Sequence, residues 1–260
     1  MKSNTTNTGL YTEILQSLLD RELIATDSSI LVGCAGSFDD GMFQDLGFTN
    51  VTLSNLAPDQ DKLRSELHFP VLHLDIEDLA SEDESYDWVV VHAGLHHCAN
   101  PAAALLEMYR VAKLGILAME PIDSGSVSLA MKLGICARYE VGSVTSKRDN
   151  VGGGLRYGGI PNLIYRFKKQ QIYQIIQTAH PEYEHDYLYW PRLVVPWWRL
   201  FRKVGVSERG QSLVKTLALP FCRIPFMANN LGFVVLKPTS GSGILQPWLE
   251  RLGDGEIRMK

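Results

Sequence analysis

The sequence predicts an α/β protein with a doubly wound, mostly parallel sheet. Two observations predict this class. Five short, almost continuously apolar runs lie between residues 29 and 120, and helical segments separate them. Strands that are apolar on both faces are typical of a parallel sheet covered by helices on both sides. A length of 260 residues with 45% hydrophobic content fits one large domain better than two.

An amphipathic helix is expected before the first strand, because apolar residues recur there at helical spacing. They are Leu10, Ile14, Leu15, Leu18, Leu19 and Leu23. The five predicted strands that follow are 29–33, 51–55, 70–75, 86–92 and 115–120. The clearest helix start is Asn100-Pro101, with Asn as N-cap and Pro at the first helical position. Two late strands, 184–190 and 230–238, are expected to close the sheet, and the last is a candidate for antiparallel pairing.

The regular alternation ends after Pro121. Residues 121–185 are predicted to be an insertion that builds the acceptor-binding pocket, with helical stretches at 124–134 and 166–180 around a glycine-rich loop. Residues 239–260 are expected to be a peripheral tail, either a helix or partly disordered. The whole chain, 1–260, is interpreted as a single domain.

Charge and composition limit the partners. Residues 1–159 hold 22 acids against 11 Lys plus Arg, whereas residues 160–223 hold 4 against 10. This asymmetry either steers an anionic partner or forms a solvated basic face. No basic cluster accompanies a nucleic-acid module, so nucleic acid is not expected. The four cysteines show no ligand spacing, so neither zinc nor disulfides are predicted. No leader or apolar run of about 18 residues is present, which favours a cytoplasmic protein.

Ligands of such sheets bind at the carboxyl ends of the strands, so the residues just after each strand are the candidates. Small residues follow the first strand, where they let the backbone approach a ligand closely. They are Gly33, Cys34, Ala35 and Gly36. The later strands end at Asn55, at Asp75 and Ile76, at His92, and at Glu120. The glycines miss the GxGxxG spacing of a pyrophosphate binder.

Three stretches carry a resemblance to a known family: "ILVGCAGS" (30–37), residues 75–121 from "DIEDL" to "AMEP", and "GFVVLKP" (232–238). They resemble the class I S-adenosylmethionine-dependent methyltransferases of the small-molecule type. The resemblance implies a Rossmann-like, seven-stranded sheet with an insertion between strands 5 and 6, and S-adenosylmethionine as the cofactor. It also implies that Asp75 binds the adenine amino group and that Ile76 packs on the ring. A helix cap is the alternative role for Asp75.

Two positions depart from the family pattern. Leu31 stands where the family has an acidic residue near the end of the first strand, and Asn55 where an acid binds the ribose hydroxyls. Asn55 still offers a neutral donor and acceptor, whereas Leu31 cannot face the cofactor's ammonium group as a carboxylate would. These departures keep open a protein that binds the cofactor without methyl transfer, or that uses it in a non-methylating reaction.

The catalytic candidates are His96, His97 and Glu120. Sugar O-methyltransferases of the family carry a His-His pair and an acid at these places, so one histidine is predicted to be the general base and Glu120 its orienting carboxylate. A pair that only packs the next helix is the alternative. We therefore predict O-methylation of a small-molecule or glycan hydroxyl, without a metal.

Two further groups of residues are interpreted as substrate contacts. Arg156, Tyr157, Tyr165 and Arg166 are expected to bind the acceptor, and the arginines suit an anionic one. The alternative is a plain loop. Residues 189–203, which mix Trp with Arg and Lys, suit a membrane surface, but an aromatic wall with snorkelling cations is favoured.

Overall fold

The computed structural model describes residues 7–194, 210–238 and 244–260, apart from residues 58, 135, 146–153, 212, 215–216, 218–219, 221 and 254–255. The predicted aromatic and basic segment, residues 189–203, is described only as far as Val194, and its remainder lies outside the described residues. No helix among the described residues is long and apolar enough to cross a membrane.

Seven strands form one sheet in the order β3-β2-β1-β4-β5-β7-β6. The strands are β1 (Ile30–Gly33), β2 (Val51–Ser54), β3 (Val71–Leu72), β4 (Tyr86–His92), β5 (Ala112–Pro121), β6 (Asp186–Arg192) and β7 (Asn230–Leu236). The first five pair in parallel, and β7 is antiparallel to both β5 and β6. The predicted class is confirmed, including the antiparallel last strand.

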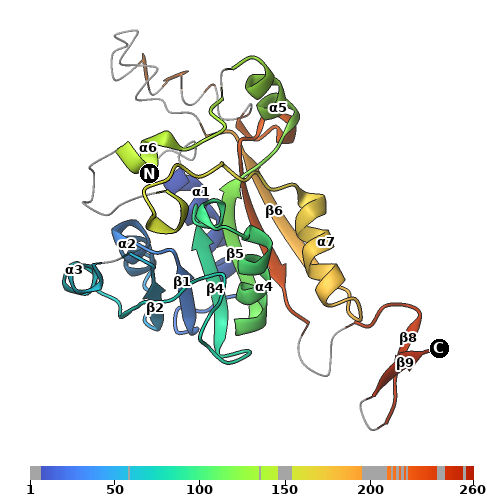
Figure 1. Ribbon diagram of the computed structural model, residues 1–260. Coiled ribbons are helices and arrows are strands. Elements are labelled where there is room, and N and C mark those ends of the chain that lie inside the picture. The colour runs from blue at the N-terminus through green and yellow to red at the C-terminus, as the bar shows by residue number, and fades with distance from the viewer. Residues whose placement is uncertain are drawn as a thin grey trace.

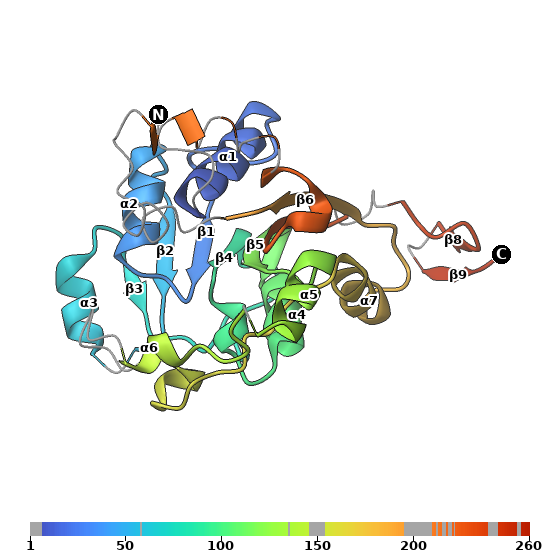
Figure 2. The ribbon, with the colours of Figure 1, turned by 90° about the horizontal axis from the view of Figure 1, so that it is seen from above.

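Helices cover both faces of this sheet (Figures 1 and 2). Helices α1 (Asn7–Asp20) and α2 (Ser37–Asp45) lie on one face, and α4 (Pro101–Val111) and α7 (Lys169–Ala179) on the other. Helix α3 (Gln60–Glu66) follows β2. The insertion after β5 holds α5 (Gly125–Lys132), α6 (Val141–Thr145), the short 3-10 turn η2 (Leu155–Tyr157), and then α7.

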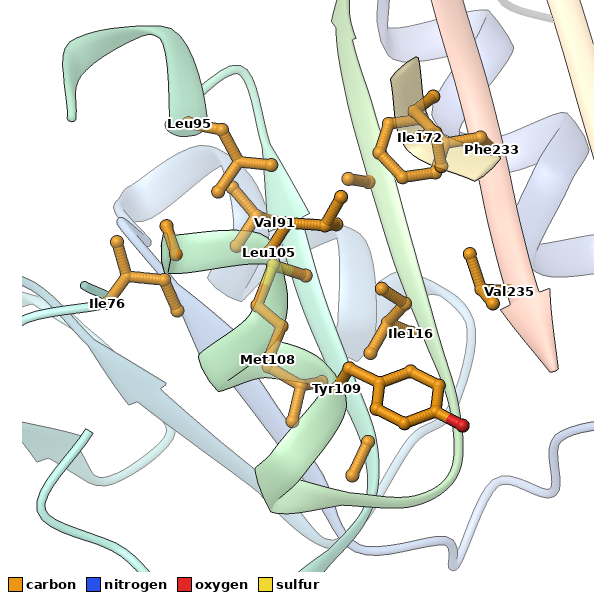
Figure 3. Packing of buried hydrophobic residues seen from close by; sticks show 14 of the residues in the cluster. Ile76, Val91, Leu95, Leu105, Met108, Tyr109, Ile116, Ile172, Phe233 and Val235 are labelled. Carbon is orange, nitrogen blue, oxygen red and sulfur yellow. The ribbon is translucent and has the colours of Figure 1, made fainter. Parts of the chain in front are cut away.

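The predicted start of α4 is confirmed in atomic terms. Pro101 is its first residue, and the side chain of Asn100 accepts a hydrogen bond of 3.2 Å from the backbone N–H of Ala103. The cap satisfies one of the N–H groups that have no partner inside the helix. The helix then packs Leu105, Met108 and Tyr109 against the sheet (Figure 3).

Alternate residues of each strand belong to two cores. Val91 and Ile116 join the core on the α4 side (Figure 3). Leu31 belongs to the same core, whereas Ile30 and Val32 join the core on the α1 side. This is the period of two that a β-strand imposes on its side chains. Leu31 is fully buried. It therefore belongs to the hydrophobic core.

Of the two alternatives given for the C-terminal tail, a helix or partial disorder, the helix is wrong. Strands β8 (Leu249–Arg251) and β9 (Ile257–Met259) pair as a separate antiparallel ribbon, which stands apart from the main sheet in Figures 1 and 2. Pro247 and Gly253 bracket the first strand, and both residues disfavour a continuous helix across the stretch.

Candidate active site

Three neighbouring strands end at the same edge of the sheet and bring the predicted site residues together. Gly33, the last residue of β1, pairs with Val91 of β4, so His92 lies one residue further. His92 in turn pairs with Met119 of β5, directly before Glu120. The strand order reverses between β1 and β4. In open α/β sheets, that reversal opens the crevice in which ligands bind.

The turn after β1 is closely packed, and it leaves no room for a side chain at Gly94. Cys34 has a φ of 55°, in the left-handed region, and a Cβ on Gly94 would lie 2.5 Å from the Cβ of Cys34. A Cβ on Gly33 would lie 2.7 Å from Cδ1 of Ile76, the residue predicted to pack on adenine. Burial raises the pKa of Cys34 to about 12. The turn thus presents backbone and a neutral thiol.

Asn55 holds this turn in place. Its Nδ2 donates to the carbonyl of Ala35 at 2.6 Å, and its Oδ1 accepts from the backbone N–H of Ala57 at 2.8 Å. A carboxylate could not donate the first of these hydrogen bonds. The amide therefore has a structural reason to stand where the family has an acid, while its contact with a ribose stays a prediction.

Asp75 lies in the turn that follows the short strand β3. Its Oδ1 accepts from the backbone N–H of Glu77 at 3.0 Å, and its Oδ2 forms an ion pair with Arg156. Nε of Arg156 also lies 3.8 Å from a carboxylate oxygen of Glu77. Arg156, predicted to bind the acceptor, thus contacts the residue predicted to bind adenine. The η2 turn of the insertion reaches over this part of the crevice.

The other predicted acceptor residues have separate surroundings. Arg166 donates to the backbone carbonyls of Ile164 and Ala137, and the ring of Tyr165 lies 4.8 Å from that of Phe167 against the core. The side chain of Tyr157 lies outside the described residues. The structure therefore does not bring Arg156, Tyr165 and Arg166 together as one clamp.

His96 lies between two carboxylates. Its Nδ1 is 2.7 Å from Oε2 of the fully buried Glu120, and its Nε2 is 3.3 Å from Oε2 of Glu140. The Nε2 of His97 is also 3.3 Å from Oε2 of Glu140. The other oxygen of Glu120 accepts from the backbone N–H groups of Gly94 and Leu95, at 2.8 and 2.7 Å. Glu120 therefore both orients His96 and fixes the turn that carries it.

Sequence reasoning missed Glu140. It directly precedes α6 in the insertion, 20 residues beyond Glu120, and no motif marks it. Asn162, also in the insertion, donates from Nδ2 to the backbone carbonyl of His96 at 2.9 Å. The insertion thus completes the histidine cluster, which only the three-dimensional fold reveals.

The two histidines have opposite electrostatics. Burial lowers the pKa of His96, but the charges and hydrogen bonds of Glu120 and Glu140 outweigh burial and raise that pKa to about 10. Burial and the neighbouring His96 lower the pKa of His97 below 6.5. At neutral pH, His96 is therefore an imidazolium, whereas His97 is a neutral ring. The side chain of His96 is 8% exposed and that of His97 is 30% exposed.

The same groups also have a spacing that a metal ion can use. One ligand atom from each of His96, His97 and Glu140 lies within 4.8 Å of the others. However, a ring nitrogen that carries a proton has no lone pair for a metal. Both ring nitrogens of His96 face carboxylate oxygens, which favours the doubly protonated ring. The arrangement thus favours a proton network, and the absence of a metal stays a prediction.

A second polar cluster lies at the end of β4, on the α1 side of the crevice. The ring of His92 stacks on Tyr11 with the ring centroids 5.0 Å apart, and its Nδ1 is 3.9 Å from Oδ1 of Asp39. Three buried atoms of this cluster have no hydrogen-bond partner among the described residues: the hydroxyl of Tyr11, Oδ1 of Asp39 and Nε2 of His92. Buried polar atoms without partners are costly, so this cluster is a candidate ligand site.

The fold defines the class of protein: its strand order, with the antiparallel β7, is that of the class I methyltransferases. Residues 30–119 match the family model described as a methyltransferase domain, and the protein is thus an S-adenosylmethionine-dependent methyltransferase. A search of the curated proteins gave no match.

Solved structures show the same fold at low sequence identity. The plantazolicin methyltransferase BpumL, in complex with SAH (S-adenosylhomocysteine), has a TM-score of 0.53 and 14% identity, covering 91% of this chain and 86% of its own. The magnesium protoporphyrin IX methyltransferase ChlM of Synechocystis PCC 6803, with bound SAH, has a TM-score of 0.50 and 11% identity, covering 88% and 83%. The YcgJ protein of Bacillus subtilis has a TM-score of 0.50 and 10% identity, covering 89% and 97%.

The residues of the crevice fit S-adenosylmethionine. The close-packed turn at Gly33 and Cys34 offers backbone, Asp75 offers a carboxylate, and the cluster around Asp39 offers buried polar atoms that lack described partners. When bound, the cofactor supplies a methyl group on a sulfonium centre. The chain's own residues must align the acceptor atom and manage its proton.

Proposed function

We propose that the enzyme methylates a hydroxyl group of a small molecule or a glycan, with His97 as the general base. The observation that carries this proposal is the cluster of His96, His97, Glu120 and Glu140 at the ends of β4 and β5. A hydroxyl must lose its proton as it accepts the methyl group, and a positioned base assists that loss. An amine that is already neutral has no such need.

Only one of the two histidines suits the role of base. A base needs a free lone pair, and His96 has a carboxylate oxygen beside each ring nitrogen, which favours a proton on both. His97 is neutral and more exposed, and Glu140 lies beside its Nε2. If Glu140 accepts a hydrogen bond from Nε2, then Nδ1 of His97 keeps its lone pair for the acceptor's proton, and the resulting imidazolium is stabilised by Glu140.

His96 has a positioning role in this proposal. Its charge balances one of the two adjacent carboxylates, and its ring lies 4.4 Å from that of His97, centroid to centroid. Glu120 and the backbone contact of Asn162 hold His96 in place. In this proposal, Glu120, Asn162 and His96 therefore position His97, which takes up the proton.

The insertion, residues 121–185, forms the acceptor pocket in this proposal. It supplies Glu140 beside the base, and Arg156, which is about half exposed, is the cation that an anionic acceptor would meet. The substrates named for BpumL and ChlM, plantazolicin and magnesium protoporphyrin IX, support a small-molecule acceptor. We place the reaction in the cytoplasm, with no nucleic-acid partner.

The test is a methyl-transfer screen. The enzyme is incubated with S-adenosylmethionine that carries a labelled methyl group, together with sugars, phenols, hydroxy acids and amines, and products are detected by mass spectrometry. We expect labelled products among the hydroxyl compounds, with the methyl group on oxygen by NMR. Products methylated only on nitrogen, sulfur or carbon would contradict the proposal.

A further inference from the structure

The acidic residue Asp39 lies in the first turn of α2, and the packing of the protein does not explain it fully. Its Oδ2 accepts from the backbone N–H of Gly36 at 3.1 Å, directly after the cofactor turn. Its Oδ1 has no hydrogen-bond partner among the described residues, although Asp39 is only 5% exposed. A buried carboxylate oxygen without a partner is costly for the folded state.

The neighbouring residue shows what a purely structural aspartate looks like here. Asp40 is buried to the same degree, but its Oδ1 accepts from the backbone N–H groups of His68 and Phe69, and its Oδ2 accepts from Nε2 of Gln44. Both of its oxygens therefore have protein partners. Of these two adjacent buried carboxylates, that of Asp40 is hydrogen-bonded within the protein through both oxygens, whereas Oδ1 of Asp39 has no partner among the described residues.

Oδ1 of Asp39 lies at the end of β4. It lies 3.9 Å from Nδ1 of His92, which is the last residue of β4, while Gly36 at the other oxygen follows β1. The carboxylate thus spans the two strand ends between which the strand order reverses. A ligand bound between these strand ends would therefore lie close to Asp39.

The surroundings of Asp39 lack a compensating cation. Among the described residues it makes no ion pair with lysine or arginine, and burial lowers the pKa of His92 to about 4, so that ring is neutral at pH 7. Burial likewise raises the pKa of Asp39 to about 7. The cluster therefore suits a ligand group that brings both a positive charge and N–H donors.

S-adenosylmethionine has one group with these two properties. Its sulfonium is cationic but has no N–H, whereas the ammonium of its methionine portion has a charge and three donors. We propose that Asp39 binds the ammonium group of the methionine portion of the cofactor, with His92 and the hydroxyl of Tyr11 as its polar neighbours. This gives the protein an acidic cofactor contact on α2, while Leu31 stays in the core. The proposal does not depend on the nature of the acceptor.

Calorimetric titration of the full chain tests it. S-adenosylhomocysteine carries the ammonium group without the sulfonium, and 5′-methylthioadenosine keeps the adenosine but lacks the amino acid. We expect Asp39→Asn to weaken S-adenosylhomocysteine roughly 10- to 100-fold, as for loss of a charge-assisted hydrogen bond, and to change 5′-methylthioadenosine by less than about twofold. Asp40→Asn is the matched control, and it should leave the ratio of the two affinities unchanged.

A deaminated S-adenosylhomocysteine completes the cycle. It should bind the parent enzyme as weakly as S-adenosylhomocysteine binds Asp39→Asn. The affinity of Asp39→Asn for the deaminated ligand should be only slightly lower than its affinity for S-adenosylhomocysteine. The proposal would be overturned if Asp39→Asn lowered the affinities for S-adenosylhomocysteine and 5′-methylthioadenosine equally, or if it left the binding of S-adenosylhomocysteine unchanged. If Asp39→Asn does not fold, the parent enzyme still decides, because equal affinities for the amino and deaminated ligands would overturn it as well.

Discussion

The carboxylate of Glu120 lies 2.7 Å from Nδ1 of His96, and through its other oxygen it also binds the two backbone N–H groups that open the turn leading to this histidine. One buried side chain thus sets both the direction of the imidazole and the shape of the loop. Glu120 therefore supports both the fold and the candidate catalytic residues. Comparing changes at Glu120, His96 and His97 should show which residue acts mainly on stability and which mainly on catalysis.

Replacing the two histidines should have different consequences. His97→Ala should lower kcat by roughly 10² to 10⁴, because general-base assistance acts in the transition state, and should leave the affinity for S-adenosylhomocysteine nearly unchanged. His96→Ala should instead lower the free energy of unfolding, by about 3 kcal/mol, because it leaves the fully buried Glu120 without its cation. Single-turnover methylation and urea unfolding measure the two effects.

The reverse pattern would assign the base to His96. In the parent enzyme, the rate should fall as pH drops below the lowered pKa of His97, since protonation removes the lone pair. If His97→Ala methylates at the parental rate, His97 is not the general base.

Stability should fall as the solution becomes alkaline. The folded protein raises the pKa of His96 from 6.5 to about 10, through Glu120 and Glu140 and against the effect of burial. The stabilisation by the imidazolium is therefore complete below pH 6.5 and is lost as pH rises towards 10. We expect Glu120→Gln to flatten this decline in the free energy of unfolding. Urea unfolding at pH 7, 8, 9 and 10 compares the two proteins, and parallel curves would contradict the prediction.

Removing Arg156 should strengthen cofactor binding. Its ion pair uses an oxygen of Asp75, the carboxylate that we predict binds the adenine amino group; if Asp75 has that role, cofactor binding must share or displace the guanidinium. Arg156 is 49% exposed, and an exposed pair contributes at most about 1 kcal/mol. Arg156→Ala should therefore tighten S-adenosylhomocysteine by up to about fivefold in calorimetry, and Arg166→Ala is the control from the same insertion. A loss of affinity would show that Arg156 itself binds the cofactor.

Two glycine substitutions should change stability in opposite directions. The φ of Gly94 is −116°, so a side chain is excluded there by space, because its Cβ would meet Cys34. Gly94→Ala should cost about 1–3 kcal/mol of unfolding free energy. Gly41, within α2, has no heavy atom within 4 Å of its would-be Cβ, and Gly41→Ala should gain about 0.5–1 kcal/mol. Urea unfolding gives both values.

Chelation should leave the protein unchanged. Because His96 is held as an imidazolium, the group of His96, His97 and Glu140 lacks one of its lone pairs at pH 7. Dialysis against EDTA should therefore shift the melting temperature by less than about 1 °C. A stoichiometric metal in elemental analysis, together with a lower melting temperature after chelation, would show that a cation occupies the cluster.

The sheet and the start of α4 could be predicted because their signals are local. Tyr86–His92 matches its predicted range, and Asn100-Pro101 caps the helix as its sequence indicates. The predicted strand at 70–75 shortens to Val71–Leu72, because Asp75 folds into its own turn with Glu77.

The site was predicted in part, because some of its partners come from distant segments. His96 and His97 follow β4, and Glu120 lies near the end of the neighbouring strand β5. The structure brings these three residues together as predicted. Glu140 and Asn162 reach the same cluster through an insertion whose path no pattern specifies. Asp39, which we propose as a cofactor contact, was not a candidate from the sequence because its spacing is that of an ordinary helix start, and only its burial beside His92 distinguishes it.

The place of β7 between β5 and β6 has a consequence for biosynthesis. This strand lies between β5 and β6, yet it is made last of the seven. While the ribosome is still translating, the first five strands can pair, but the ten-residue strand β5 keeps a bare edge until Leu236 has emerged. Exposed strand edges recruit other chains. A nascent chain that stops before Asn230 therefore exposes an unpaired strand edge, to which a strand of another chain can add.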